Sequence, residues 1–248
     1  MFMLSSSILT SPIFLTVVLG FVAGFAGTVG GFAARFTTVT RSRHDFISAF
    51  GAGALIGAVG LVLIPHGVEN LPLWLAVLTF LGGGLVALAL EQLTTKKAEA
   101  KTGGTSTFAA MMLDFLPEAL VVGALIPVDR MQAIIVTIII IAQNGPEGFA
   151  AFSEMAEEGD RKSRRKALWL LSTLPIIGIL AVGFGLWLCE IDDAALGLIM
   201  AGASGGILYL VFKTIIPEAH DSKDGPWPAY GGIIGFTVAL LGYGLTVH

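Results

Sequence analysis

Charged residues are scarce in this sequence. Asp, Glu, Lys and Arg make up 13% of the 248 residues, whereas hydrophobic residues make up 55%. A soluble domain carries about 25% charged residues, so this chain has too little charge to cover a surface in water. The composition therefore excludes a water-soluble domain and indicates an integral membrane protein, with the lipid bilayer as its surroundings.

Other absences narrow the class of protein further. The single cysteine, Cys189, cannot form a disulfide within the chain. The net charge of −4 lacks the basic excess of a nucleic-acid-binding protein, so we expect no nucleic-acid partner. The metalloprotease motif H-E-x-x-H is missing as well. We therefore expect a protein that is not an enzyme and needs no cofactor.

Eight long apolar runs alternate with short charged or Pro/Gly/Ser-rich segments along the chain. Each run has about the 20 residues that cross a bilayer as a helix. The approximate bounds of the runs are 10–34, 46–65, 72–90, 108–127, 131–152, 167–189, 194–216 and 228–247.

The pattern within these runs favours helices over strands. The run 133–142 is continuously apolar and lacks the alternation of a barrel strand. Glycines at four-residue spacing, such as Gly53 and Gly57, are typical of membrane helices that approach closely. We therefore predict an all-α integral membrane protein with eight transmembrane helices, forming a single domain over residues 1–248.

The distribution of Lys and Arg predicts the orientation. With eight spans, the loops between helices 1–2, 3–4, 5–6 and 7–8 share one side of the membrane. Those loops and the adjoining helix ends hold thirteen of the fourteen Lys and Arg residues, and only Arg130 falls on the other side. Since an excess of Lys and Arg marks the cytoplasmic side, we expect a multi-pass cell-membrane protein with both termini outside the cytoplasm.

Polar residues interrupt the fourth and fifth runs in matching ways. Asp114 and Glu118 lie four residues apart and share a helix face, and Gln143 and Glu147 repeat that spacing. Each pair contains a proline that kinks its helix and frees a backbone carbonyl. Ionisable residues inside a membrane span are costly and mark a functional pathway or site. We therefore expect these two helices to carry the functional site.

A short connection makes the two helices a tight antiparallel pair. A fold about position 128.5 sets Asp114 level with Gln143, whereas a fold about 130.5 sets Glu118 level with Gln143 and Asp114 level with Glu147. The spacing leaves both registers open. In either register three carboxylates meet in a low dielectric, where they need protons or a cation. Such oxygen-rich clusters suit divalent metals.

Two other function classes remain open on these residues. The same carboxylates would serve a proton relay in a proton- or cation-coupled transporter or channel of another class. An intramembrane enzyme is the weaker alternative, because the sequence offers no recognised catalytic motif in a suitable helix context. A metal-binding measurement separates the proton relay from a divalent-metal site, since a proton relay needs no affinity for Zn²⁺ or Mn²⁺.

Three segments of the chain resemble one known family. DFLPEA at 114–119, QNGPEG at 143–148 and IIPEAH at 215–220 are similar to motifs of the ZIP (Zrt/Irt-like) family of divalent-metal transporters, and of its compact bacterial branch in particular. The resemblance implies a single transporter domain built as an inverted-repeat bundle. It also implies uptake of zinc, iron or manganese as substrate, a homodimer, and sliding of helices 1, 4, 5 and 6 against the other four.

The resemblance also implies which residues bind the metal. Five positions match the family's metal ligands: Asp114, Glu118, Gln143, Asn144 and Glu147. Relatives commonly have His at the position of Asp114, Asn at that of Phe115, and Glu at that of Leu174. We therefore expect one principal metal ion rather than two, held by oxygen ligands that improve the competition of Mn²⁺ or Fe²⁺ with Zn²⁺.

Flanking segments supply further candidates. His66 and Glu69 lie at the predicted outer end of the second helix, as possible entry ligands. At the inner end of the seventh helix, IIPEAHDS offers three possible exit ligands: Glu218, His220 and Asp221. The two segments look like inverted counterparts, as in transporters built from inverted repeats, although polar residues solvated at helix ends fit equally well for His66 and Glu69. The charged segment 154–166 is expected to be a solvated loop.

Overall fold

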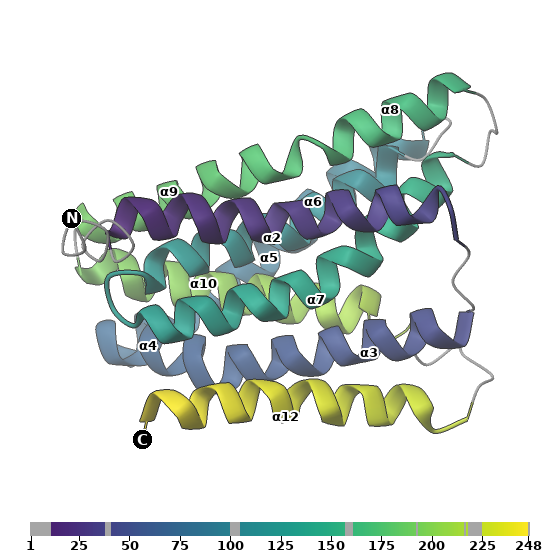
Figure 1. The fold of residues 1–248 in the computed structure, drawn as a ribbon. Coiled ribbons are helices and arrows are strands. Elements are labelled where there is room, and N and C mark those ends of the chain that lie inside the picture. The colour runs from purple at the N-terminus through teal and green to yellow at the C-terminus, as the bar shows by residue number, and fades with distance from the viewer. Residues whose placement is uncertain are drawn as a thin grey trace, which may run out of the picture.

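The computed structural model describes residues 11–37, 41–99, 105–156, 161–191, 193–215, 217 and 225–247. These residues form helices running roughly side by side (Figure 1), and no strand occurs among them. The helices are α2 (Pro12–Ala34), α3 (Arg41–Ala58), η1 (Val59–Leu63), α4 (Ile64–Asn70), α5 (Leu73–Glu99), α6 (Thr105–Leu125), α7 (Arg130–Met155), α8 (Arg161–Leu171), α9 (Leu174–Ile191), α10 (Asp193–Leu210), η2 (Val211–Ile215) and α12 (Trp227–Val247). The all-helical prediction is confirmed.

Seven segments of the described chain are long and apolar enough to cross a membrane, by length and composition alone. Their bounds are Pro12–Ala34, Asp45–Asn70, Leu73–Leu93, Arg130–Met155, Arg161–Cys189, Ala194–Lys213 and Trp227–Leu245. Each agrees closely with one of the predicted runs. The remaining predicted run coincides with α6, which is helical over 21 residues but is not among the seven. A count of eight spans therefore stays a prediction.

Local sequence sets where α2 and α7 begin. Ser11 caps α2, because its hydroxyl accepts a hydrogen bond from the Phe14 backbone N–H at 3.1 Å, and Pro12 occupies the first helical position. The Asp129 carboxylate caps α7 by accepting from the N–H groups of Met131 and Gln132, at 2.9 and 3.1 Å. The capping residue Asp129 comes directly after the turn 126–128, which joins α6 to α7. The two helices therefore form the expected tight antiparallel pair.

The helices pack most extensively within two groups. In the first group, α2 packs against α7 and α9, α6 packs against α7 and α9, and α8 packs against α7 and α2. In the second group, α3 packs against α12, and α10 packs against α5 and α4. The yellow α12 runs along α3 in Figure 1. Smaller contacts, such as those of α10 with α6 and of α3 with α7, join the two groups. The first group consists of helices 1, 4, 5 and 6 of the predicted spans.

Glycine allows the closest helix contacts. A Cβ on Gly30 of α2 would lie 1.8 Å from the carbonyl oxygen of Gly145 on α7, and one on Gly53 of α3 would lie 1.9 Å from that of Gly232 on α12. No side chain fits in such a gap, so these backbones touch only because Gly is present. The contact at Gly30 presses α2 against the polar segment of α7.

Two π-helical turns occur at matching places. The five-residue turn η1 ends two residues before Pro65, and the five-residue turn η2 ends two residues before Pro217. A proline removes an N–H from the helical ladder, and a wider turn before it changes the bonding from i→i−4 to i→i−5. The Ile64 N–H accordingly donates to the Val59 carbonyl. Such turns are frequent at functional sites.

The expectation of a solvated loop over 154–166 is wrong at both ends. Helix α7 continues to Met155, and α8 begins at Arg161. Arg and Lys are good helix formers, and α8 buries Ala167 and Leu171 against its neighbours. Among the described residues of 154–166, the charged side chains therefore stand on helices, at Glu154 of α7 and from Arg161 onward in α8.

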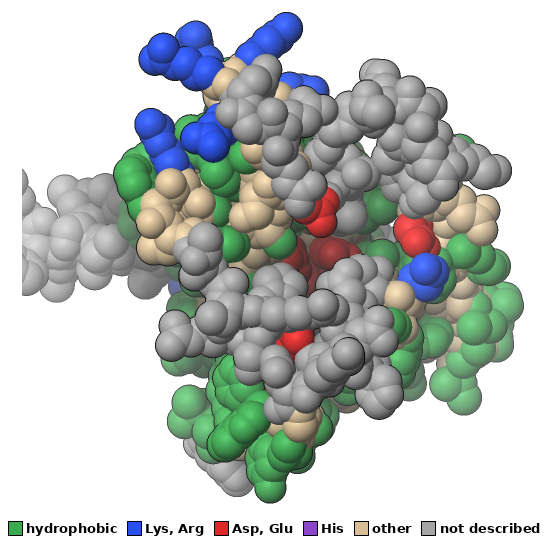
Figure 2. Space-filling model, turned by 90° about the vertical axis from the view of Figure 1, so that its right-hand side faces the viewer, with side chains coloured by type: hydrophobic (Ala, Val, Ile, Leu, Met, Phe, Trp, Pro, Cys, Tyr) green, Lys and Arg blue, Asp and Glu red, His purple; other side chains and the backbone are tan. Residues whose placement is uncertain are grey.

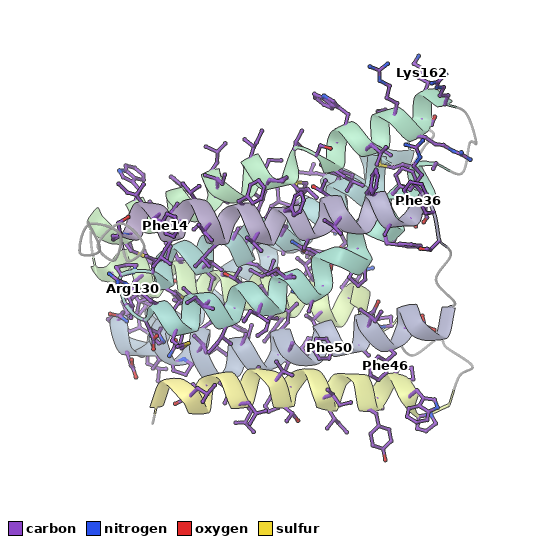
Figure 3. All side chains as sticks on the ribbon, viewed as in Figure 1. Phe14, Phe36, Phe46, Phe50, Arg130 and Lys162 are labelled. Atoms are coloured by element: carbon purple, nitrogen blue, oxygen red, sulfur yellow. The ribbon has the colours of Figure 1, made fainter. Side chains whose placement is uncertain are left out.

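Arg130 is separated along the bundle from the Lys and Arg residues of α8. Arg130 lies at the end where α2 begins, near Phe14, whereas Lys162 lies at the opposite end, near Phe36 (Figure 3). This placement agrees with the split of Lys and Arg found in the sequence.

Candidate metal centre

One hydrogen bond fixes the register of α6 and α7. The Gln143 side-chain nitrogen donates to the Glu118 carboxylate oxygen Oε1 at 3.0 Å. Glu118 is therefore level with Gln143, which selects the fold point of 130.5 between the two registers that the sequence left open. In an antiparallel pair with this register, Asp114 and Glu147 lie level with each other one turn away.

Two oxygen atoms at this level are buried without a hydrogen-bond partner. The Glu118 side chain is 2% exposed and that of Gln143 is 5% exposed. Glu118 Oε2 and Gln143 Oε1 accept no hydrogen bond. A buried carboxylate oxygen without a partner is costly. A cation bound at such an oxygen would offset that cost.

The amide oxygen of Gln143 faces the second helix group. A Cβ placed on Gly51 of α3 would lie 3.0 Å from Gln143 Oε1. The missing side chain at Gly51 therefore leaves space beside this oxygen. The polar centre consequently lies where α7 of the first group meets α3 of the second.

Asp114 and Glu147 are half-buried, and each has further interactions of its own. Among the described residues no group of three His, Cys, Asp or Glu side chains is close enough to hold one metal ion. Asp114, Glu118 and Glu147 therefore do not form such a group of three in this structure, and the amide of Gln143 stands opposite Glu118. The oxygens available at this level come from both a carboxylate and an amide.

The Asn144 side chain makes a hydrogen bond that joins two helices. Its side chain is buried, and its nitrogen donates to the Ala23 carbonyl of α2 at 3.0 Å. This bond joins α7 to α2 across the interface where the glycines meet. The side-chain oxygen is then the only atom of Asn144 left to bind a cation.

Phe115 and Leu174 are fully buried in the apolar core. A Cβ placed on Gly178 of α9 would lie 3.0 Å from the tip of the Phe115 ring, and the Leu174 side chain lies against Gly27 of α2. Both residues therefore fill space between helices and provide no donor atom where relatives are expected to have one.

The flanking candidates are placed only in part. His66 is half-buried on α4, with its Nδ1 atom 2.9 Å from the Val62 carbonyl, while Glu69 is exposed. Neither joins a three-residue metal group within the part of the chain that the structure describes. The predicted exit ligands Glu218, His220 and Asp221 lie outside the described residues.

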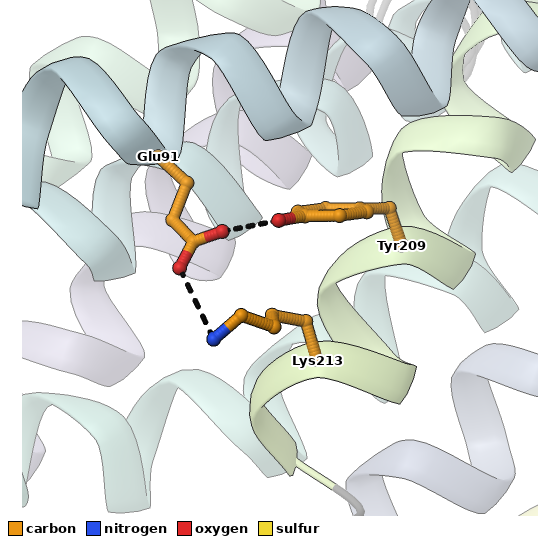
Figure 4. A network of polar contacts seen from close by, with 3 residues as sticks. All are labelled: Glu91, Tyr209 and Lys213. Atoms are coloured by element: carbon orange, nitrogen blue, oxygen red, sulfur yellow. Dashed lines mark hydrogen bonds and ion pairs between the residues drawn. The ribbon is translucent and has the colours of Figure 1, made fainter.

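Sequence reasoning missed a polar network that joins α5 to α10 and η2. The Tyr209 hydroxyl donates to one Glu91 carboxylate oxygen, and the Lys213 ammonium lies 3.6 Å from the other (Figure 4). Glu91 follows the apolar run 72–90 directly and looks like an ordinary boundary charge. The four-residue spacing of Tyr209 and Lys213 is the signal that both face one neighbour.

The letters of the serine-hydrolase motif G-x-S-x-G occur at 202–206. Ser204 lies in the middle of α10, is fully buried, and donates its hydroxyl to the Met200 carbonyl at 2.6 Å. The catalytic motif needs an exposed serine on a strand-to-helix turn. This serine therefore serves helix packing.

The fold and this centre define a multi-pass helical membrane protein with a buried polar site between two proline-containing helices. The model of the ZIP zinc transporter family matches residues 94–247, which include α6 through α12 and all three Pro-Glu segments named above. The chain belongs to the ZIP family. A comparison with curated proteins finds no match. ZIP proteins are transporters rather than enzymes, and membership implies transport of divalent metal cations across a membrane.

Proposed function

We propose that this protein takes up divalent metal cations into the cytoplasm through the centre between α6 and α7. The observation that carries the proposal is the pair of buried oxygens without hydrogen-bond partners, Glu118 Oε2 and Gln143 Oε1. A cation bound there would satisfy both oxygens and neutralise Glu118. The same cation would be lost readily if either helix moved.

The neighbouring turn supplies the rest of the ligand set. Asp114 and Glu147 are level with each other by the register that Glu118 and Gln143 define, and Asn144 contributes its side-chain oxygen. A set made only of oxygens favours harder ions such as Mn²⁺ more than a set with His does. We therefore propose one ion per protomer and a broad preference for zinc, iron and manganese.

The two helix groups suggest how the ion moves. The first group, α2, α6, α7, α8 and α9, carries the ligands, while Gly51 of the second group faces Gln143 Oε1. Sliding of the first group along the second would carry the ion from one side to the other. This elevator movement needs the smooth interface that the small residue at Gly51 provides.

The π-helical turns support an inverted repeat. η1 and η2 occupy equivalent places before Pro65 and Pro217 in the second and seventh predicted spans. We propose that these spans are counterparts in an eight-helix inverted-repeat bundle. His66 and Glu69 would then serve entry, and Glu218, His220 and Asp221 would serve exit.

Orientation and assembly complete the proposal. The concentration of Lys and Arg on one side supports a cell-membrane protein with both termini outside the cytoplasm. A homodimer follows from the family resemblance.

A proton- or cation-coupled channel using the same carboxylates is the second candidate, because Asp114 and Glu147 would form a like-charge pair that also suits protons.

Metal uptake into proteoliposomes tests the proposal. Wild-type protein should take up Zn²⁺, Fe²⁺ and Mn²⁺, and Glu118→Gln should abolish uptake because the bound cation loses its buried counter-charge. The matched control Glu154→Gln changes an exposed carboxylate near the C-terminal end of α7 and should transport normally. Proton flux without metal uptake in the wild type would favour the second candidate instead.

A further inference from the structure

A basic cavity lies at the end of the bundle where α8 begins. It has a volume of about 700 Å³ and is lined by Arg35, Phe152, Arg161, Lys162, Arg164, Arg165 and Leu168. Lys and Arg side chains gather along one edge of this face of the molecule (Figure 2). Of the seven lining residues that the structure describes, five are cationic and none is acidic.

Two separate helices bring the cations together. Arg161, Arg164 and Arg165 follow the i, i+3, i+4 spacing that places them on one face of α8. Arg35 comes from the end of α2, where its N–H donates to the Phe32 carbonyl at 3.2 Å. Positive-inside topology requires basic residues on this side of the membrane, but it does not require residues 126 positions apart in the chain to line one cavity.

The charges on α8 interact unfavourably with the dipole of that helix. The N-terminus of a helix is the positive end of its dipole, and cations there are unfavourable. The lining cations also repel one another across the cavity. An anion bound in the cavity would relieve both costs.

The surface beside the cavity is apolar and faces outward. Trp169 on α8 is 68% exposed, and Phe36 at the end of α2 is 68% exposed. The Arg35 guanidinium lies 5.7 Å from the centre of the Phe36 ring. Aromatic residues at this level are typical of the boundary between headgroups and acyl chains. The ligand that fits has an anionic head and an apolar tail.

We infer that this cavity binds the phosphate headgroup of an anionic phospholipid from the leaflet beside α8, with its acyl chains along Trp169 and Phe36. Basic pockets between membrane helices bind such headgroups. Since α2 and α8 belong to the helix group that carries the metal ligands, the lipid would be held by that group.

Native mass spectrometry of the full-length protein tests this inference. The protein is offered phosphatidylglycerol and phosphatidylcholine at equal concentrations in a mild detergent, and retained lipids are counted. Wild type should retain phosphatidylglycerol preferentially. Arg165→Gln should weaken its apparent affinity about fivefold, since one basic residue contributes about 1 kcal/mol to binding of anionic lipid.

Lys166→Gln is the matched control, because Lys166 is an exposed cation on the same helix that does not line the cavity. Its phosphatidylglycerol retention should equal that of the wild type. Equal loss in both variants would indicate general attraction between charges and overturn the site. Displacement of the lipid by inorganic phosphate in excess, with the same dependence on Arg165, would overturn the lipid in favour of a free anion.

Discussion

Gln143 donates a hydrogen bond from its side-chain nitrogen to Glu118 across the α6–α7 interface at 3.0 Å. Because the side-chain nitrogen of Gln143 points toward Glu118, its side-chain oxygen points in another direction. Gln143 Oε1 faces Gly51 of α3. One bond therefore fixes the register of the two proline-containing helices. It also leaves one oxygen of each residue available to a cation.

Loss of the Glu147 carboxylate should stop transport. Glu147→Gln keeps the size of the side chain but removes a charge that balances the metal one turn from Glu118. We expect uptake into proteoliposomes to fall to the level of empty vesicles, while the amount of protein in the membrane stays unchanged. Near-normal uptake would exclude Glu147 from the metal pathway.

Filling the space at Gly51 should slow transport without unfolding the protein. In Gly51→Ala the new methyl group would lie 3.0 Å from Gln143 Oε1, and overpacking of this kind costs about 1–3 kcal/mol. The matched control is Gly82→Ala on α5, where a Cβ meets nothing within 4 Å. Initial uptake rates should fall in Gly51→Ala and not in Gly82→Ala. Equal rates in the two variants would remove Gly51 from the ion's surroundings.

The residue at position 114 should influence selectivity. Asp114→His introduces a nitrogen ligand that zinc favours over manganese. In side-by-side competition we expect the ratio of Zn²⁺ to Mn²⁺ uptake to rise. Glu154→His, at an exposed position of α7, should leave the ratio at its wild-type value. An unchanged ratio in Asp114→His would mean that residue 114 does not bind the metal.

The network around Glu91 should stabilise the second helix group. Glu91→Gln weakens the bond from Tyr209 and removes the ion pair with Lys213, so we expect the free energy of unfolding to fall by about 1 kcal/mol. Lys213→Met should cost less, because the Lys213 side chain is 58% exposed. Thermal unfolding in detergent measures both. Adding Tyr209→Phe to Glu91→Gln should cost little more, since the two residues share one interaction.

Much of this arrangement follows from sequence, and the exceptions have physical reasons. Apolar run lengths and proline positions predicted the helices and the pairing of α6 with α7. Spacing alone left two registers of α6 against α7 open, because the position of the turn between them was known only to within a few residues. The side-chain hydrogen bond between Glu118 and Gln143 distinguishes the two registers. A run of charge predicts a loop, but Arg and Lys also favour helices, so the sequence does not predict the helical start of α8. Glu91 was missed because its partners, Tyr209 and Lys213, are remote in sequence.

Anomalous diffraction from crystals of the full-length protein soaked in Mn²⁺ tests the central claim most directly. We predict one strong anomalous peak per protomer between α6 and α7, within roughly 2.0–2.3 Å of Glu118 Oε2 and Gln143 Oε1, the usual range of metal–oxygen bonds. Two bridged peaks at this centre would contradict the single-ion site. Peaks found only at the helix ends would contradict the assignment of Glu118 and Gln143 as ligands of the transported ion.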